Sequence, residues 1–407
     1  MPRSGWVKPV SDRRLSDLVS VGLLTRVFPP GLVDEVIAAT DRTERRHRVL
    51  PARVMAYFAI GMALYSEGSY EDVMAQLTDG LSWSSGRAES FVAPSKSGIF
   101  QARARLGAAP VEALFRRVAR PLAEPDAPGA WLAGRRLVAM DGTCLDVADT
   151  VANDEFFGRA GVNKGERAAF PLARVVALAE CGTHAVLDAE VGPYTSSEVA
   201  LAGPLLDRLE SGMLVLADRG FCGFLLWRRA AATGADLLWR AKNARNALTL
   251  HLVEDLPDGS WLAQIFPSGP ARKVSIEPIT VRVIDYTIED GRENPEAYRL
   301  FTTILDPAVA SAEVLALTYA ERWEIENTFD ELKTHQRGPR IVLRSKSPDL
   351  VLQEIWGHLC CHYAIRTLMA ETATAGGRDP DQVSFVAALR VTRRSIAHQG
   401  DFSPSSP

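Results

Sequence analysis

Two short apolar runs, each followed at once by an aspartate, constrain the fold of this chain more than any other feature. Residues 135–140 (RRLVAM) lead into Asp141, and residues 212–217 (GMLVLA) lead into Asp218. Runs of this length are typical of buried strands. Between them lie two further strand-like segments, FPLARVVALAE and THAVLDAEVG, and a helix that begins at a serine cap, SSEVALAGPLLDRLE. We expect three antiparallel strands, a crossover helix and a parallel strand, with both aspartates at the carboxyl ends of neighbouring strands.

The pattern of hydrophobic residues changes along the chain and predicts its organisation. Helical periodicity runs from about Leu15 to Phe115, a Pro/Ala/Gly-rich stretch without periodicity follows, and strand and helix patterns then alternate. The expected parts are a helical DNA-binding domain (1–120), a linker (121–130), an α/β domain (131–345) with a β-rich insertion (about 244–296), a C-terminal helical region (346–398) and a disordered tail (399–407).

Composition indicates an ordinary globular protein. Hydrophobic residues make up 47% of the 407 residues and charged residues 24%. There is no run of 18 apolar residues, and the N-terminus lacks the apolar core of a signal peptide, so we expect a cytoplasmic protein with no membrane partner. Five scattered cysteines predict reduced thiols. The HLCCH segment at residues 358–362 lies in an apolar helical run, and we interpret it as a packed helix rather than a zinc site.

Charge is distributed unevenly along the chain. The net charge is −4, which argues against nucleic-acid binding by bulk electrostatics, yet residues 1–120 hold 17 Lys and Arg against 12 Asp and Glu. The segment SKSGIFQARARLG, with Ser95 as a possible cap, carries Arg103 and Arg105 as candidate DNA contacts. A surface helix that touches nothing explains the same pattern equally well.

One further segment, residues 319–333 (YAERWEIENTFDELK), places polar side chains on a single helix face. At about 100° per residue, Tyr319, Arg322, Glu326 and Lys333 share a narrow stripe, beside an apolar stripe that would anchor the helix. An acid, two cations and a phenol on one face suit a phosphodiester and its metal ion. The alternative is a solvated charged face with an ordinary ion pair between residues four apart.

Together, Asp141, Asp218 and Glu326 supply the hard oxygen ligands that two divalent cations about 4 Å apart require. Other acids compete for these positions. Asp330 falls on the same helix face as Glu326, and Asp146 and Asp149 follow Asp141 closely. We prefer Asp141 because it directly ends the buried strand, whereas Gly142 and Thr143 are expected to turn the chain before Asp146.

Three motifs resemble the catalytic blocks of DDE transposases of the insertion-sequence-four type. They are DGT at residues 141–143, ADRGF at residues 217–221, and the Tyr-x2-Arg-x3-Glu-x6-Lys signature that starts at Tyr319. The resemblance extends from about Leu15 to Arg394. It implies an RNase H-like mixed sheet flanked by helices, with a β-rich insertion and an all-helical N-terminal domain.

By this resemblance, Asp141, Asp218 and Glu326 bind two Mg²⁺ ions, for which Mn²⁺ can substitute, and Tyr319, Arg322 and Lys333 hold the DNA backbone near the cut. In the family, the enzyme nicks the transposon end, forms and reopens a hairpin, and joins the 3′ ends to target DNA. An aromatic residue of the β insertion stacks on a flipped base. Trp261 is the first candidate for this residue, and Trp239 and Trp323 are further candidates. Core packing is the alternative role for each of them.

The leading hypothesis is therefore a cut-and-paste transposase that binds its element's terminal inverted repeats and bridges two ends as a homodimer, associated with the nucleoid when bound to DNA. One rival is an RNase H-like nuclease that cuts without joining strands. Another is an inactive descendant that only binds DNA, for example as a repressor. The presence of all three acids and of the cationic stripe argues against the inactive descendant.

Overall fold

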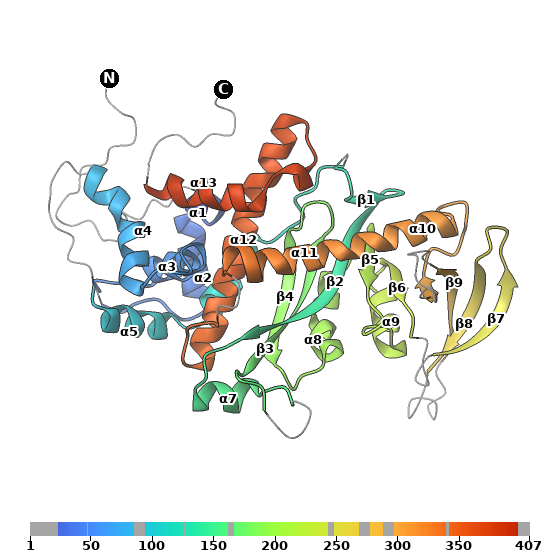
Figure 1. Cartoon of the computed structure of the whole chain (residues 1–407), viewed down its shortest axis with the longest axis horizontal. Coiled ribbons are helices and arrows are strands. Elements are labelled where there is room, and N and C mark those ends of the chain that lie inside the picture. Colours follow the sequence, from blue (N-terminus) through green and yellow to red (C-terminus); the bar gives the residue numbers. More distant parts are fainter. Residues whose placement is uncertain are drawn as a thin grey trace. The chain divides into compact units, whose positions relative to one another are not determined.

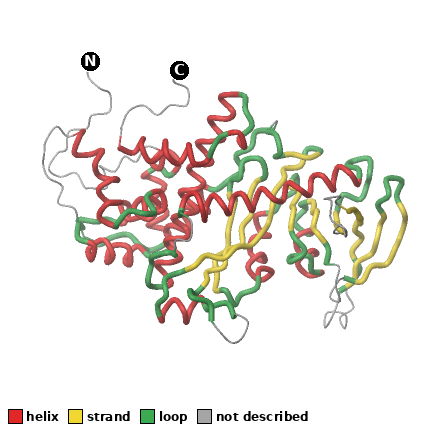
Figure 2. Tube along the Cα trace, in the orientation of Figure 1, coloured by secondary structure: helices red, strands yellow, loops and turns green. Residues whose placement is uncertain are grey.

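The computed structural model describes residues 23–46, 48–84, 94–125, 127–161, 167–242, 248–267, 277–287, 297–338 and 342–397. These residues form two compact units. The first takes its described residues from 1–120, 145–172 and 330–407, and the second takes its described residues from 121–144 and 173–329. Figure 2 shows that helices dominate the first unit and that nearly all strand residues belong to the second. The expected tail at 399–407 lies outside the described residues.

The first unit is built around one long helix, α12, of 29 residues. Helices α1, α3, α6 and α13 pack against it (Figure 1). The helices and short helical turns of this unit are α1 (Leu23–Val27), α2 (Pro30–Ala39), α3 (Ala52–Leu64), α4 (Tyr70–Ser84), α5 (Lys96–Leu106), α6 (Ala109–Val118), α7 (Val151–Phe157), η5 (Glu331–Gln336), α12 (Pro348–Gly376), η6 (Pro380–Gln382) and α13 (Phe385–Ala397). Every residue of α3 from Val54 to Leu64 is buried. The C-terminal helical region, expected as a separate part, thus shares one core with the N-terminal helices.

The α12 segment 358–362 is buried along its whole length, His358 and His362 included, as expected of a packed helix. His362 Nε2 donates to the Glu331 carboxylate at 2.9 Å, and Arg366 pairs with the same carboxylate. The five cysteines are all free thiols. None of the helices that the structure describes is both long enough and apolar enough to cross a membrane.

A single mixed sheet forms the second unit. Its strand order is β4-β3-β2-β5-β6-β10-β9-β8-β7, and β1 pairs with β2. The strands are β1 (Trp131–Leu132), β2 (Arg135–Asp146), β3 (Leu172–Glu180), β4 (Val186–Pro193), β5 (Met213–Ala217), β6 (Asp236–Arg240), β7 (Thr249–Asp255), β8 (Trp261–Phe266), β9 (Ile279–Thr287) and β10 (Ala297–Thr302). Strands β2, β5 and β6 run parallel, and β3 and β4 are antiparallel. The RNase H-like fold class predicted from the sequence is confirmed.

Helices pack on this sheet and complete the second unit. Helix α8 (Glu198–Leu205) lies against β4 and continues into the 3₁₀ turn η2 (Leu206–Arg208), while α9 (Phe224–Ala231) lies against β6. Figure 1 shows α10 (Ala312–Tyr319) and α11 (Glu324–Asp330) running across the strands. Of the two serines expected as the cap of α8, Ser196 and Ser197, it is Ser197 whose side chain accepts a hydrogen bond from the Ala200 amide.

The β-rich insertion extends the main sheet instead of forming a separate module. Strands β7, β8 and β9 follow one another in antiparallel pairing, and β9 pairs with β10, which in turn pairs with β6. Arg282 of β9 is fully buried, donates to the Ser260 hydroxyl at 2.8 Å and to the Ala310 carbonyl at 2.8 Å, and pairs with Asp258. Residues 243–247, 268–276 and 288–296 of the expected insertion lie outside the described residues.

The segment expected to be a linker, residues 121–130, belongs to the second unit. The backbone amides of Leu122 and Ala123 donate to the Glu180 carboxylate at 2.9 and 2.8 Å. Glu180 also pairs with Arg136, and its side chain is fully buried. A buried carboxylate needs such donors, so these bonds fix the segment to the end of β3.

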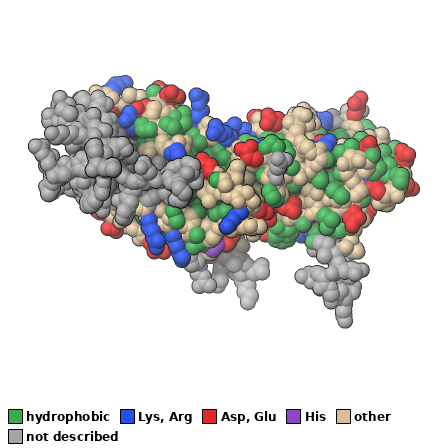
Figure 3. Space-filling model, turned by 90° about the horizontal axis from the view of Figure 1, so that it is seen from above, with side chains coloured by type: hydrophobic (Ala, Val, Ile, Leu, Met, Phe, Trp, Pro, Cys, Tyr) green, Lys and Arg blue, Asp and Glu red, His purple; other side chains and the backbone are tan. Residues whose placement is uncertain are grey.

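Surface charge is mixed. On the face shown in Figure 3, Lys and Arg side chains are interspersed with Asp and Glu side chains, in keeping with the net charge of −4. Attraction for a polyanion must therefore come from local groups of basic residues.

Candidate functional site

The parallel pairing of β2 and β5 brings Asp141 and Asp218 to neighbouring positions. The register pairs Met140 with Ala217, and each aspartate is the next residue along its strand or just beyond it. Adjacent strands lie about 4.8 Å apart, so the two carboxylates stand side by side at the end of this pairing. β2 itself continues to Asp146, so the expected turn at Gly142 and Thr143 was wrong; only its pairing with β5 ends before Asp141.

The environment of Asp141 disfavours a negative charge. Burial raises the pKa of Asp141 to about 6, and this effect outweighs the hydrogen bond from the Gly142 amide and the positive charge of Arg322. The amide donates at 2.7 Å. Glu326 and Asp218 raise the pKa further because they are negative charges nearby. A carboxyl group in this setting gains most from a bound cation.

Arg322 bridges two of the predicted acids. Its Nη1 donates to Asp141 Oδ2 at 3.1 Å, and its Nη2 donates to Glu326 Oε1 at 3.3 Å. Burial alone would lower the pKa of Arg322, but Tyr319 and the three acids together raise it. The guanidinium also lies over the ring of Trp323, 5.0 Å from its centroid, and its buried Nε has no hydrogen-bond partner among the described residues. Arg322 thus concentrates positive charge where the acids meet.

The predicted helical stripe is only partly regular. A 3₁₀ turn, η4 (Ala320–Trp323), separates α10 from α11, and a π-helical turn, η5, follows α11. Tyr319 is buried, its hydroxyl donates to the Ala217 carbonyl at 3.4 Å, and burial raises the pKa of this phenol above its usual range. Lys333 lies in η5, in the first unit, whereas Tyr319, Arg322 and Glu326 belong to the second.

The competing acids have other surroundings. Asp149 pairs with Arg159, and Asp330 is exposed and lies 3.4 Å from His335 Nε2. Asp146 ends β2, where its carbonyl accepts a hydrogen bond from the Leu343 amide at 2.9 Å. All three lie in the first unit, whereas Asp141 belongs with Asp218 in the second.

Glu198, the first residue of α8, is a further acid at this site that the sequence analysis missed. A Cβ built on Gly142 would come within 2.9 Å of the Glu198 side chain, and one built on Gly220 would lie 3.8 Å from its Oε2. Glu198 also lies 3.5 Å from Arg174 Nη1. The signal in the sequence was a glutamate directly after a helix-capping serine, which normally indicates only a favourable first turn.

An aromatic pocket of about 580 Å³ adjoins Arg322. Its aromatic lining consists of Tyr286, Tyr298, Tyr319 and Trp323. The rings of Tyr286 and Tyr298 are stacked at 5.2 Å, and the Arg240 guanidinium lies 4.0 Å above the Tyr298 ring. Trp323 is 57% exposed. Flat rings beside a cationic group suit a planar aromatic ligand.

The other two tryptophan candidates are placed differently. Trp239 is fully buried and packs edge-on against Trp227 at 5.2 Å, so the stacking role considered for it was wrong. Trp261 starts β8 and does not line the aromatic pocket; its indole Nε1 donates to Asp285 Oδ2 at 3.4 Å.

Arg103 is not a surface contact. Its side chain is fully buried and donates to the Gln353 side chain at 2.9 Å, to the Ser345 hydroxyl at 3.1 Å and to Tyr70. The prediction that it touches DNA was wrong, because a helix has an inner face that the RAR spacing did not reveal. Arg105, two residues on, is exposed. Ser95 caps their helix, α5, as predicted.

The donor set fits hard divalent cations. Asp141, Asp218 and Glu326 are oxygen donors, and Arg322 shows that a positive charge is accommodated between two of them. In this structure the Arg322 guanidinium lies between Asp141 and Glu326, so an ion held by both of these acids would take its place.

This geometry agrees with the comparisons with known proteins. Residues 18–116 match the family described as insertion element 4 transposase N-terminal, and residues 132–364 match the family described as transposase DDE domain. The match to the DDE domain covers more than half of the chain and defines its class, a DDE transposase that acts on DNA with divalent metal. The chain belongs to the insertion element 4 family of these enzymes, which are polynucleotidyl transferases and endonucleases.

Two proteins of Escherichia coli support the same assignment. The chain is 28% identical over 379 residues to transposase InsG for insertion sequence element IS4 of Escherichia coli (strain K12), covering 92% of this chain and 83% of that protein. It is 31% identical over 222 residues to putative transposase InsZ of the same organism, covering 54% and 71%. A solved structure, the piggyBac transposase synaptic complex with hairpin DNA, aligns with a TM-score of 0.48 and 11% identity over 92% of this chain and 79% of that one.

Proposed function

We propose that this transposase binds the terminal inverted repeats of its own element, cuts there through a hairpin intermediate and joins the freed ends to target DNA. In this proposal Asp141, Asp218 and Glu326 are the ligands of two Mg²⁺ ions, for which Mn²⁺ can substitute. The observation that carries it is the adjacency of Asp141 and Asp218 after the paired Met140 and Ala217. When bound, the ions would activate the attacking oxygen and neutralise the leaving oxygen.

Arg322 is the residue that would hold the backbone phosphate beside the cut. Its planar guanidinium offers paired donors that match phosphate oxygens, and it already lies against Asp141 and Glu326. Tyr319 would help to position Arg322. The centroid of its ring lies 5.9 Å from the guanidinium carbon, and its hydroxyl donates to the carbonyl of Ala217, the residue before Asp218. Lys333 is proposed as a second phosphate contact.

The aromatic pocket would receive a base that leaves the DNA stack. Trp323 is exposed and adjoins Arg322, so a base could stack on it while its phosphate stays at the guanidinium. Trp261, the candidate from sequence, does not line this pocket, and we propose Trp323, which does, in its place.

The rest of the proposal concerns the oligomeric state of the enzyme and its location in the cell. A homodimer would bridge two transposon ends, since cut-and-paste excision has to treat both ends together. The enzyme would act in the cytoplasm, associated with the nucleoid while bound to DNA.

The test uses purified protein, Mg²⁺ and labelled duplexes that carry the ends of the element. Wild type and the control Glu254→Gln, which removes an exposed acid of β7, should yield hairpin and joined products. Glu326→Gln should bind the ends and yield neither. Cleavage that survives Glu326→Gln contradicts the site assignment.

The products also separate the rival functions. Nicks without joined strands would favour a nuclease that does not transfer strands. Binding of the ends without cleavage in either Mg²⁺ or Mn²⁺ would favour a DNA-binding relic or repressor.

A further inference from the structure

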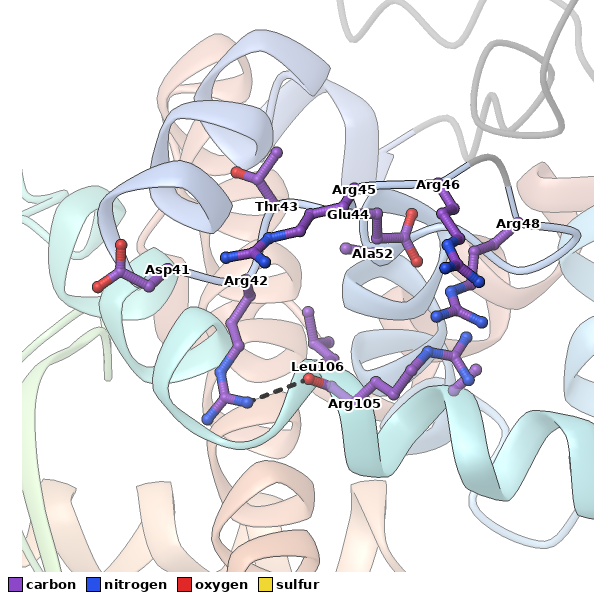
Figure 4. A pocket seen from close by; sticks show the side chains of 11 residues that line it. Asp41, Arg42, Thr43, Glu44, Arg45, Arg46, Arg48, Ala52, Arg105 and Leu106 are labelled. Carbon is purple, nitrogen blue, oxygen red and sulfur yellow. Dashed lines mark hydrogen bonds between the residues drawn. The ribbon is translucent and has the colours of Figure 1, made fainter.

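A pocket lined by five arginines opens in the N-terminal helices, and Arg105 is the one lining residue that is also a candidate DNA contact from the sequence. It has a volume of about 470 Å³ and is formed by the loop between α2 and α3 and by the end of α5. Its lining residues are Asp41, Arg42, Thr43, Glu44, Arg45, Arg46, Arg48, Ala52, Ala102, Arg105 and Leu106. Figure 4 shows the guanidinium groups of Arg46, Arg48 and Arg105 turned into the same part of the pocket. We call this cavity the arginine pocket, after its five arginines, Arg42, Arg45, Arg46, Arg48 and Arg105.

Positive charge in the arginine pocket is not balanced by the protein. Among the described residues, none of the five arginines has a carboxylate within 4.0 Å, although Asp41 and Glu44 also line the pocket. The two hydrogen bonds of these side chains go to carbonyl groups, from Arg42 Nη1 to Arg105 O at 3.3 Å and from Arg105 Nη2 to Leu50 O at 3.4 Å.

Other arginines of the same unit differ in this respect. Arg53 pairs with Asp34, Arg26 with Glu371 at 2.7 Å, and Arg116 with Glu112 at 3.2 Å. Like charges that converge without such partners, as those of Arg46, Arg48 and Arg105 do, repel one another, and a bound anion would relieve this repulsion.

The chemistry of the lining selects among anions. Guanidinium forks match the oxygens of phosphate, and a volume of about 470 Å³ exceeds what one phosphate fills. The remaining lining side chains are Thr43, Ala52, Ala102 and Leu106. None of the residues that line it is aromatic, so a nucleobase would find no ring to stack on. The pocket therefore suits a sugar-phosphate backbone better than a free nucleotide.

We propose that the arginine pocket binds consecutive backbone phosphates of the transposon end. This rests on the proposed function, in which the enzyme holds such an end during cleavage. Phosphate contacts carry no sequence information, so the pocket would supply affinity and register, and base recognition would come from elsewhere on the protein.

Binding of labelled end duplex, measured by fluorescence anisotropy in EDTA over a series of salt concentrations, tests the proposal without any dependence on cleavage. The variant combines Arg46→Gln, Arg48→Gln and Arg105→Gln. The matched control is Arg117→Gln, an exposed arginine of α6 in the same unit without an ion-pair partner among the described residues. Because each phosphate contact contributes about 0.9 to the slope of log Kd against log salt, the triple variant should lower the slope by about 2 to 3 and weaken Kd at least about tenfold.

Three comparisons make the outcome decisive. The control should keep the wild-type slope, and unrelated duplex should lose affinity in the triple variant as much as end duplex does. Replacement of the same three arginines by lysine should restore most of the slope, because lysine keeps the charge; this result also shows that the loss is not a folding defect. An unchanged slope and Kd in the folded triple variant would overturn the proposal.

Inorganic phosphate serves as the competing ligand. If titration calorimetry shows that wild type binds phosphate, that the triple variant does not, and that both bind DNA equally, the pocket is an anion site and not a DNA contact. If the arginine pocket proves not to bind DNA, the proposed function is unaffected. Cleavage is tested separately, by comparing wild type with Glu326→Gln at an excess of DNA.

Discussion

Gly357 lies where α12 crosses α3, and replacing it by alanine should destabilise the first unit. A Cβ at this position would lie 2.5 Å from the Ala59 carbonyl oxygen and 3.0 Å from its carbon, both rigid backbone atoms. Ordinary contact needs about 3.4 Å or more, so the helices must separate by most of an ångström. Overpacking of this kind costs about 1–3 kcal/mol. Better helix propensity returns about 1 kcal/mol, so we expect a net loss of up to about 2 kcal/mol.

The same helix offers its own control. Gly376, the last residue of α12, has room for a methyl group, since the nearest atom to an added Cβ is a flexible Arg378 carbon at 3.7 Å. Gly376→Ala should therefore leave stability unchanged or raise it slightly. Urea unfolding followed by circular dichroism measures both variants. If Gly357→Ala is as stable as Gly376→Ala, the close packing of α12 on α3 inferred here is refuted.

Three further predictions concern pH, the phosphate clamp and the flipped base. Burial lowers the pKa of His358 from 6.5 to about 3, so the stability it contributes is complete above pH 6.5 and is lost as pH falls, at about 1.4 kcal/mol per pH unit. Urea unfolding at pH 7 and pH 5 should show a smaller loss for His358→Gln than for wild type, and equal losses would contradict this. Arg322→Lys should slow single-turnover cleavage about 10²-fold or more, since lysine lacks the forked guanidinium that can bridge two partners. Binding of the ends in EDTA should stay the same, and a cleavage rate near that of wild type would argue against Arg322 as the residue that holds the phosphate. Trp323→Ala should reduce the fluorescence rise of 2-aminopurine placed next to the cut, with stacking worth about 1–3 kcal/mol, and Trp261→Ala should not; the opposite result would restore Trp261 as the stacking residue.

The part of the fold that follows from local patterns was predictable from the sequence. The buried runs before Asp141 and Asp218 became β2 and β5, and their parallel pairing followed from the helix between them. The extension of β2 beyond Asp141 was not predictable in this way, because Gly142 and Thr143 are turn residues by propensity while strand length is decided by pairing partners.

Long-range packing explains most of the remaining differences. The hydrophobic pattern of α12 identified a buried helix, but which helices bury it depends on contacts hundreds of residues apart in sequence. The prediction that Arg103 contacts DNA was wrong for the same reason. A charged residue in a basic helix suggests an exposed position, whereas Arg103 is buried because its guanidinium donates to Tyr70, to Ser345 and to Gln353 of α12.

The helix that carries Arg322 and Glu326 shows how far a periodicity argument reaches. Residues four apart on a helix face one another, and this pair does meet, at 3.3 Å, although the 3₁₀ turn η4 winds about 120° per residue just before it. The argument holds there because at most two of the four steps from Arg322 to Glu326 belong to η4, so an error of about 20° per residue adds up to no more than about 40°. Lys333 lies seven residues beyond Glu326 and across the π-helical turn η5, where winding changes again. Its place on the stripe was therefore the weakest inference from the spacing. Its contribution to DNA binding has to be measured by substitution, since the periodicity alone does not decide it.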